Sequence, residues 1–190
     1  MNNDKVLKIN NKSNKPDNIV HRDNDIMERC IKIENQLPKF MKDYFIYLKG
    51  SVAVSTHYAY LEDINFFCNY LVESQELTKA EIIKDITLDE FNNIKARDVN
   101  LFLGDYCSRY YKQTEKNTLI FENNNRALAR KKSSLSTLFK FLYRNEQLDN
   151  NITDGFNPIK LPKPQPDAIK RLDIDEVAKM LDAVESGEGL

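Results

Sequence analysis

Six basic residues and no acidic residue lie between positions 123 and 145. At about 100° per residue of an α-helix, most of them share one side with hydroxyl residues. This side carries Arg126, Arg130, Ser133, Thr137, Lys140 and Arg144. Exposed helix faces usually mix both signs of charge, because like charges at i,i+4 repel each other. The uncompensated positive charge indicates that this helix binds a polyanion.

The opposite side of the same helix is apolar and must hold it in place. Its members are Leu128, Leu135, Leu138, Phe139 and Leu142. This spacing is typical of a helix that buries one face against a domain. The sequence therefore predicts a basic surface anchored from behind by a hydrophobic core.

Composition is compatible with such a surface, although the formal net charge of the 190 residues is only −1. Residues 165–190 hold seven acids and three bases, a net −4, which leaves +3 for residues 1–164. Three widely spaced cysteines suggest reduced thiols, and with two histidines they form no metal-site spacing. We expect no metal, no cofactor and no small-molecule ligand. No apolar run is long enough for a membrane span, so we expect a soluble, cytoplasmic protein.

Helical spacing recurs along the chain, and tight hairpin dipeptides are absent, which favours an all-α bundle of four to five helices. We expect Ser55 or Thr56 to cap one helix, Asp98 to open another through Tyr111, and Thr87 and Glu90 to form a capping box. The predicted organisation is a flexible tail at 1–24, a helical DNA-binding domain at 25–158, a linker at 159–172, and at 173–190 the first helix of a truncated domain.

In this order, the helices resemble the N-terminal core-binding (SAM-like) domain of tyrosine recombinases, the Xer-type and phage-integrase family. One helix is similar to a family signature through Ser55-Thr56, Tyr60, Asp63-Ile64, Phe67 and Tyr70-Leu71. A second resembles it through Arg130-Lys131, Ser133, Leu135 and the run 138–142. Asn157-Pro158, Leu161 to Pro164, and Leu172 to Leu181 are similar to the family's linker and the opening of its catalytic domain. Lys132 departs from the pattern, which usually has an apolar residue there.

The resemblance implies that this chain forms half of a clamp on duplex DNA, in an enzyme of integration, excision or chromosome-dimer resolution. It implies that the catalytic residues lie outside this chain, in the C-terminal domain, and that other recombinase subunits are partners. The predicted DNA contacts are Thr56, His57, Tyr60, Arg126, Arg130, Lys131, Ser133, Ser134, Thr137 and Lys140. Reversing Arg130 and Lys140 to glutamate is expected to abolish binding with little unfolding.

Other interpretations of the same residues stay open. A basic face is often only solvated surface. Tyr60 also suits a core, His57 suits a helix cap or a core, and Lys131 could run its stem along the apolar stripe. Phe66 and Phe141 lie off the main stripes of their helices, which suggests contacts with a neighbouring subunit. The alternative function is a helical protein-interaction adaptor, whose basic helix would bind an acidic partner.

Overall fold

The structure is a computed structural model that describes residues 15–113, 118–161 and 174–186. It is mostly helical and contains one two-stranded hairpin, which confirms the all-α class. The chain divides into a first compact unit that ends at Ile159 and a second that begins at Lys160. The second unit contains a single described helix, α7 (Ile174–Ser186), at the position where the sequence predicts one.

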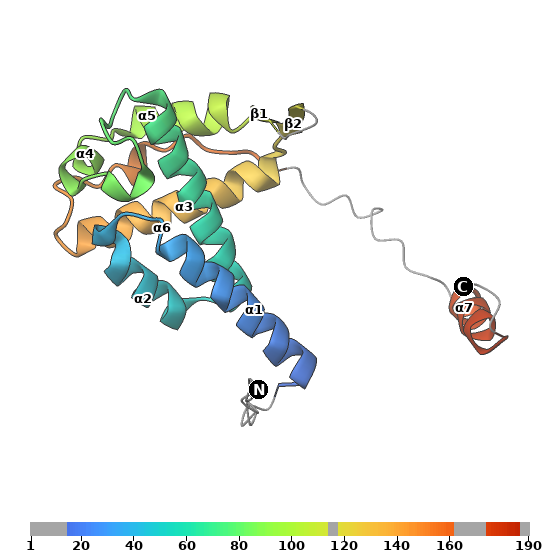
Figure 1. Cartoon of the computed structure of the whole chain (residues 1–190). Coiled ribbons are helices and arrows are strands. Elements are labelled where there is room, and N and C mark those ends of the chain that lie inside the picture. The colour runs from blue at the N-terminus through green and yellow to red at the C-terminus, as the bar shows by residue number, and fades with distance from the viewer. Residues whose placement is uncertain (1–14, 114–117, 162–173, 187–190) are drawn as a thin grey trace, which may run out of the picture. The chain divides into compact units, whose positions relative to one another are not determined.

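Four longer helices build the first unit, and short elements connect them. The longer helices are α1 (Asp17–Glu34), α2 (Lys42–Ser51), α3 (Val54–Ser74) and α6 (Asn125–Arg144). The short helices are η1 (Lys39–Met41), η2 (Ile83–Asp85), α4 (Leu88–Asn92), α5 (Ala96–Leu101), η3 (Phe102–Tyr106) and η4 (Thr153–Gly155). The strands β1 (Arg109–Gln113) and β2 (Thr118–Glu122) form the antiparallel hairpin before α6. In Figure 1, α1 lies along α3, and α6 crosses α3 steeply.

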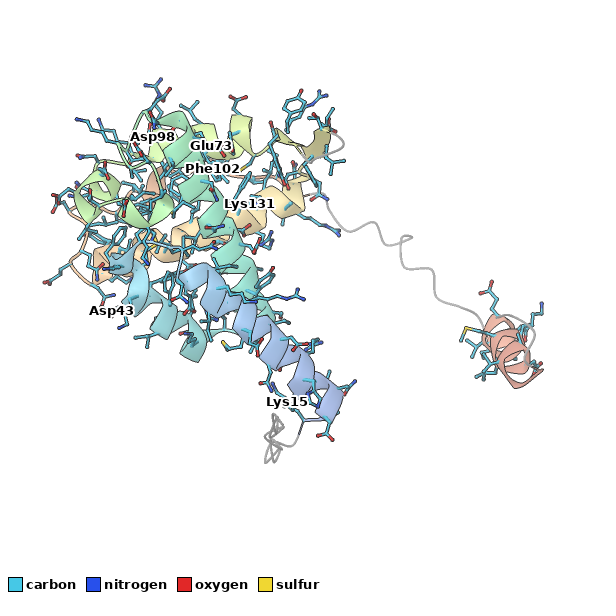
Figure 2. All side chains as sticks on the ribbon, viewed as in Figure 1. Lys15, Asp43, Glu73, Asp98, Phe102 and Lys131 are labelled. Atoms are coloured by element: carbon cyan, nitrogen blue, oxygen red, sulfur yellow. The ribbon has the colours of Figure 1, made fainter. Side chains whose placement is uncertain are left out.

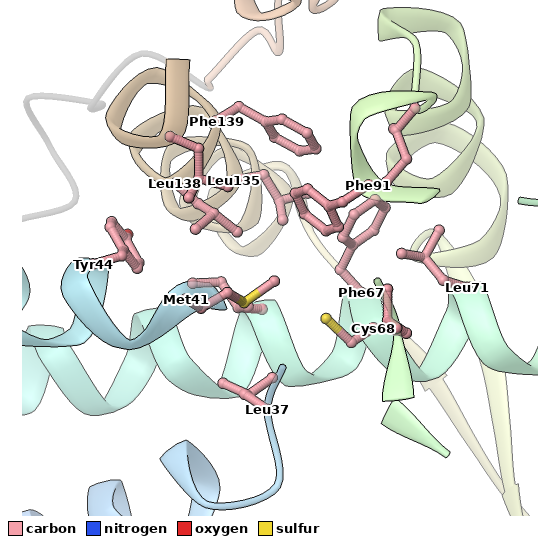
Figure 3. Close-up of a cluster of buried hydrophobic side chains, with 14 of the residues drawn as sticks. Leu37, Met41, Tyr44, Phe67, Cys68, Leu71, Phe91, Leu135, Leu138 and Phe139 are labelled. Atoms are coloured by element: carbon pink, nitrogen blue, oxygen red, sulfur yellow. The ribbon is translucent and has the colours of Figure 1, made fainter. Parts of the chain in front are cut away.

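Aromatic side chains from four elements fill the core where α3 and α6 cross (Figure 3). Phe67 of α3 lies at its centre, with its ring centroid 4.9 Å from that of Phe102 and 6.3 Å from that of Phe139. Phe139 of α6 stacks on Phe91 of α4 at 4.9 Å. Edge-to-face and offset-stacked pairs of this kind stabilise a core beyond the area that they bury. The core therefore holds α6 from behind, as its apolar stripe predicts.

The structure corrects three boundaries. Helix α1 begins at Asp17, so residues 17–24 of the predicted flexible tail are helical, with the half-buried Ile19 and Val20. Helix α3 begins at Val54 after the N-cap Ala53, so neither Ser55 nor Thr56 caps it. The helix predicted from Asp98 through Tyr111 is wrong at both ends, because α5 begins earlier and β1 has started by Arg109.

The last part of the first unit is packed onto the bundle. Asn100 donates to the carbonyl of Gly155 at 2.9 Å and accepts from the backbone of Asn157 at 2.8 Å. A Cβ atom at Gly155 would lie 2.7 Å from the Cβ of Ala96, so a side chain there is excluded. The predicted linker begins only beyond this attachment, and its residues 162–172 lie outside the described residues.

The capping box of α4 is confirmed and gives a pH prediction. Glu90 accepts from the backbone of Thr87 and of Lys79, each at 2.9 Å, and these bonds lower its pKa from 4.5 to about 2. The folded state therefore binds this proton less readily than the unfolded state does, so the stabilisation is complete above pH 4.5 and is lost as the pH falls towards 2. We expect Glu90→Gln to lose less stability than the parent protein between about pH 5 and pH 2, measured by urea denaturation. Glu81→Gln, an exposed control, should behave like the parent.

Candidate nucleic-acid interface

Helix α6 has the two-sided character that its sequence predicts. Asn124 caps its N-terminus by accepting from the backbone of Ala127 at 3.0 Å. Leu135, Leu138 and Leu142 are completely buried on one side. The other side faces solvent, and we call it the basic ridge: Arg126, Lys132, Ser133, Ser136, Thr137, Lys140 and Arg144.

Two adjoining hollows run along the basic ridge. The first, of about 420 Å³, is lined by Tyr47 of α2 and by Thr137, Lys140, Phe141, Arg144 and Asn145. The second, of about 380 Å³, is lined by Ala129, Lys132, Ser133, Ser136, Thr137, Lys140 and Ile159. Thr137 and Lys140 belong to both, so the ridge and its flanks form one continuous surface.

The charge of the basic ridge is not neutralised. Helix α6 contains no acidic residue, and Arg126, Lys140 and Arg144 form no ion pair among the residues that the structure describes. Lys132 donates through Nζ to the carbonyl oxygens of Phe156, at 3.4 Å, and Asn157, at 2.8 Å. Carbonyls orient this ammonium but do not cancel its charge. Four positive groups therefore remain available to an anion.

The hydroxyl groups at the centre of the ridge already use their protons. Ser133 Oγ donates to the carbonyl of Ala129 at 3.0 Å, and Thr137 Oγ1 donates to that of Ser133 at 2.8 Å. In this arrangement each hydroxyl oxygen can still accept a hydrogen bond from a ligand. The surface thus offers hydrogen-bond acceptors at Ser133 and Thr137, with cationic groups beside them at Lys132 and Lys140 and towards the two ends at Arg126 and Arg144.

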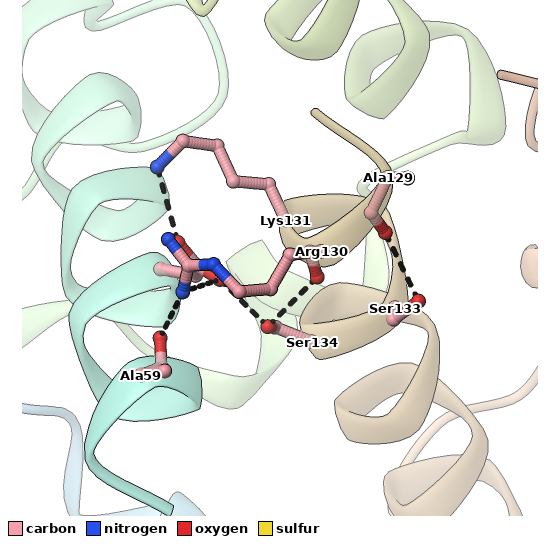
Figure 4. A network of polar contacts seen from close by, with 7 residues as sticks. Ala59, Ala129, Arg130, Lys131, Ser133 and Ser134 are labelled. Atoms are coloured by element: carbon pink, nitrogen blue, oxygen red, sulfur yellow. Dashed lines mark hydrogen bonds and ion pairs between the residues drawn. The ribbon is translucent and has the colours of Figure 1, made fainter. Parts of the chain in front are cut away.

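Three predicted contact residues lie away from the ridge, around a buried carboxylate (Figure 4). Asp63 of α3 is 1% exposed and accepts from Arg130 at 2.7 Å, Lys131 at 3.0 Å and Ser134 at 2.8 Å. Arg130 also donates to the carbonyl of Ala59 at 2.9 Å. Buried charges need such partners, because an unpaired charge loses its solvation. The three hydrogen bonds to Asp63 join α6 to α3.

This cluster corrects the predicted contact set. Lys131 and Ser134 are buried, so they are not available to touch DNA directly. Lys131 lies between α6 and α3 (Figure 2), with its Nζ 4.7 Å from the ring centroid of Phe66. The guanidinium of Arg130 is partly exposed but already bound to Asp63. The earlier expectation for reversing Arg130 is therefore revised: a glutamate there would face Asp63 and destabilise the fold.

The predicted contact residues at the start of α3 are buried or half-buried. His57 is 1% exposed, so a direct DNA contact is wrong and its core alternative holds. Its Nε2 lies 3.2 Å from Oε1 of Glu34, without hydrogen-bond geometry, and burial lowers the pKa of His57. Thr56 and Tyr60 are half-buried, and Tyr60 packs against the core. The hydrogen bond from Arg130 to the carbonyl of Ala59 links this segment to α6.

The predicted contact set omits three residues of the basic ridge. Arg144 is exposed and was placed on the basic side of the helix, but it was not named as a contact. Lys132 and Ser136 are half-buried at the flank of that side, and the sequence did not single them out as contacts. Tyr47 comes from α2, and no pattern within one helix predicts a neighbour from another. Phe141 and Phe66, predicted to face another subunit, pack internally: Phe141 against Tyr44 and Tyr47, and Phe66 against Phe102 and Tyr106.

Other kinds of site find little support in the described residues. No group of three or more histidine, cysteine or carboxylate side chains there could hold a metal ion. Burial raises the pKa of Tyr44, Tyr70 and Tyr106, which works against forming a nucleophilic phenolate. Within the same parts of the chain, no helix has the length and apolar character that crossing a bilayer demands.

Comparisons with known proteins do not assign this chain to a family. No family model matches the sequence, and neither the curated proteins nor the solved structures contain a detectable match.

Proposed function

We propose that this chain is the DNA-binding domain of a site-specific tyrosine recombinase and binds duplex DNA through the basic ridge. The observation that carries the proposal is the ridge itself, whose four positive groups have no carboxylate partner among the described residues. Most affinity for duplex DNA comes from Lys and Arg neutralising phosphates. The resemblance in motif order supports the recombinase class, and the catalytic residues are proposed to lie in another domain.

Dimensions support a duplex as the ligand. From Arg126 to Arg144 the ridge spans 18 helical steps, or about 27 Å at 1.5 Å per residue. About 16 phosphate charges lie along that length of DNA axis, at one per 1.7 Å. The major groove, about 12 Å wide, admits a helix whose cations reach its phosphate walls while short polar groups face the base edges. Arg126, Lys132, Lys140 and Arg144 are assigned to phosphates, and Ser133 and Thr137 to bases.

A salt titration tests this proposal against the adaptor alternative. Four phosphate contacts predict a slope of about −3.6 for log affinity against log salt, so affinity falls about a hundredfold between 50 and 200 mM. The measurement is fluorescence anisotropy of a labelled duplex, with an acidic peptide as the competing ligand. An adaptor would bind the peptide and show no such dependence with DNA. Selection from random duplexes would then reveal whether one sequence recurs, as a site-specific protein requires.

A further inference from the structure

The β1–β2 hairpin is an exposed element that the proposed DNA contacts do not use. Five residue pairs join its strands, from Arg109 with Glu122 to Gln113 with Thr118. A two-stranded hairpin is only marginally stable in water, and three or more strands are usually needed. Its apolar side chains are nevertheless exposed: Tyr111 64%, Ile120 54%, Leu119 45% and Phe121 38%. In Figure 2, side chains project from the hairpin away from the bundle.

One face of the hairpin is attached to the bundle and the other is open. Tyr110 stacks on Phe121 at 5.1 Å and contacts Phe66 of α3 at 4.9 Å. At the base, Asn123 bonds to the carbonyls of Ser108, at 3.2 Å, and Cys107, at 2.7 Å. The paired Tyr111 and Ile120 lie on the opposite, open face. The hairpin is thus held in a defined orientation with an apolar row uncovered.

The outer edge of β2 is a free strand edge. All five residues of β2 are exposed, and only β1 pairs with it among the described residues. A free edge presents unpaired N–H and C=O groups, which native proteins usually protect with lysine, proline or a bulge. The sequence Thr-Leu-Ile-Phe-Glu contains neither lysine nor proline. What fits this edge is another extended strand.

We infer that β2 pairs antiparallel with β2 of a second copy of this chain, centred on Ile120. In that register Ile120 lies opposite Ile120, Leu119 opposite Phe121, and Thr118 opposite Glu122. On the open face, Tyr111 and Ile120 of both copies form one apolar row across four strands, and no like charges meet directly. The four-stranded sheet supplies the missing strands. The pairing does not depend on the proposed DNA binding.

The strength of this contact follows from its size. One five-residue edge on each copy offers much less than the roughly 1,000 Å² that a specific stable interface buries. The dimer is therefore weak in free solution. It forms readily where another interaction holds two copies close together, because tethering raises the effective concentration to about millimolar.

Cysteine cross-linking without DNA tests the pairing and its register. Opposite residues of antiparallel strands have Cα atoms about 4.5 to 5.5 Å apart, within the range that a disulfide spans. We expect Ile120→Cys to give a disulfide dimer at least tenfold faster than Tyr111→Cys in a glutathione redox buffer. Tyr111 is the more exposed of the two, and the three native cysteines are buried. Equal rates would indicate random collision and overturn the inference.

A second measurement tests the pairing without introducing a cysteine into β2. Sedimentation velocity of the parent protein should show a weak dimer that increases with concentration, and Ile120→Lys should abolish it. A dimer that persists in Ile120→Lys would overturn the inference, as would its absence from the parent at every concentration. Because neither experiment contains DNA, failure of the pairing and failure of the proposed function are read separately.

Discussion

Replacing Arg126, Lys140 and Arg144 together with glutamate will weaken duplex binding by more than about a hundredfold, because three of four phosphate contacts are lost and repulsion is added. The salt slope should fall from about −3.6 to about −0.9, the value for one remaining contact at Lys132. The free energy of unfolding should change by no more than about 0.5 kcal/mol, because these exposed side chains make no ion pairs in the described structure. Anisotropy and urea denaturation measure the two effects.

A matched control separates the ridge from the overall charge of the protein. Lys39, Lys42 and Lys84 are exposed and line a separate hollow of about 400 Å³ beside Pro38 and Phe45. Their reversal to glutamate changes the net charge by the same amount without touching α6. It should leave most of the affinity intact. Equal losses from both triple variants would contradict the assignment to the ridge and indicate only a nonspecific response to net charge.

Asp63→Ala is expected to have the largest effect on stability, about 3–5 kcal/mol, because it leaves a buried cation unpaired. The cation is Lys131, which is 8% exposed, whereas Arg130 can turn towards solvent. Ser134→Ala should cost only about 1 kcal/mol, the usual contribution of one hydrogen bond. Urea denaturation of the parent protein and of both variants measures these losses, with the exposed Asp25→Ala as the control.

A double variant identifies the cause of that loss. In Asp63→Ala/Lys131→Met the buried charge is gone and the stem of the side chain is kept, so part of the lost stability should return. If the double variant is no more stable than Asp63→Ala, the unpaired ammonium is not the reason for the loss. A loss below about 1 kcal/mol in Asp63→Ala itself would show that the cluster contributes little.

Features that are set by spacing within one helix were predicted from the sequence, whereas features that depend on contacts between two helices were not. The apolar stripe of α6 and the capping box of Thr87 and Glu90 follow from spacing within a few residues, and both are confirmed. The basic side of α6 also follows from spacing, but its division into a free ridge and an internal cluster does not. That division is set by Asp63 on α3, 67 residues before Arg130. One feature of the sequence indicates this partner: Asp63 is a carboxylate among the apolar residues of α3, and a buried carboxylate needs a cation.

The hairpin could not be recognised for a different reason. Each strand has only five residues, which is too few to separate alternation from helical spacing. Tyr110 and Tyr111 also continue the apolar pattern of the preceding helical segment, so the sequence predicts that the helix extends through them. The contacts that define the strands, between Tyr110, Phe121 and Phe66, are tertiary. The sequence within each strand supplied no local substitute for these contacts.

Lys132 also determines where the chain leaves the first unit, because its ammonium binds two backbone carbonyls. Those carbonyls belong to Phe156 and Asn157, close to the end of the first unit at Ile159. The polypeptide therefore leaves this unit from a point fastened to the middle of α6, and Ile159 itself lines a hollow of the ridge. If α6 lies on a duplex, the chain leaves the first unit within a side chain's length of the nucleic acid, because Lys132 holds residues 156 and 157 beside that helix.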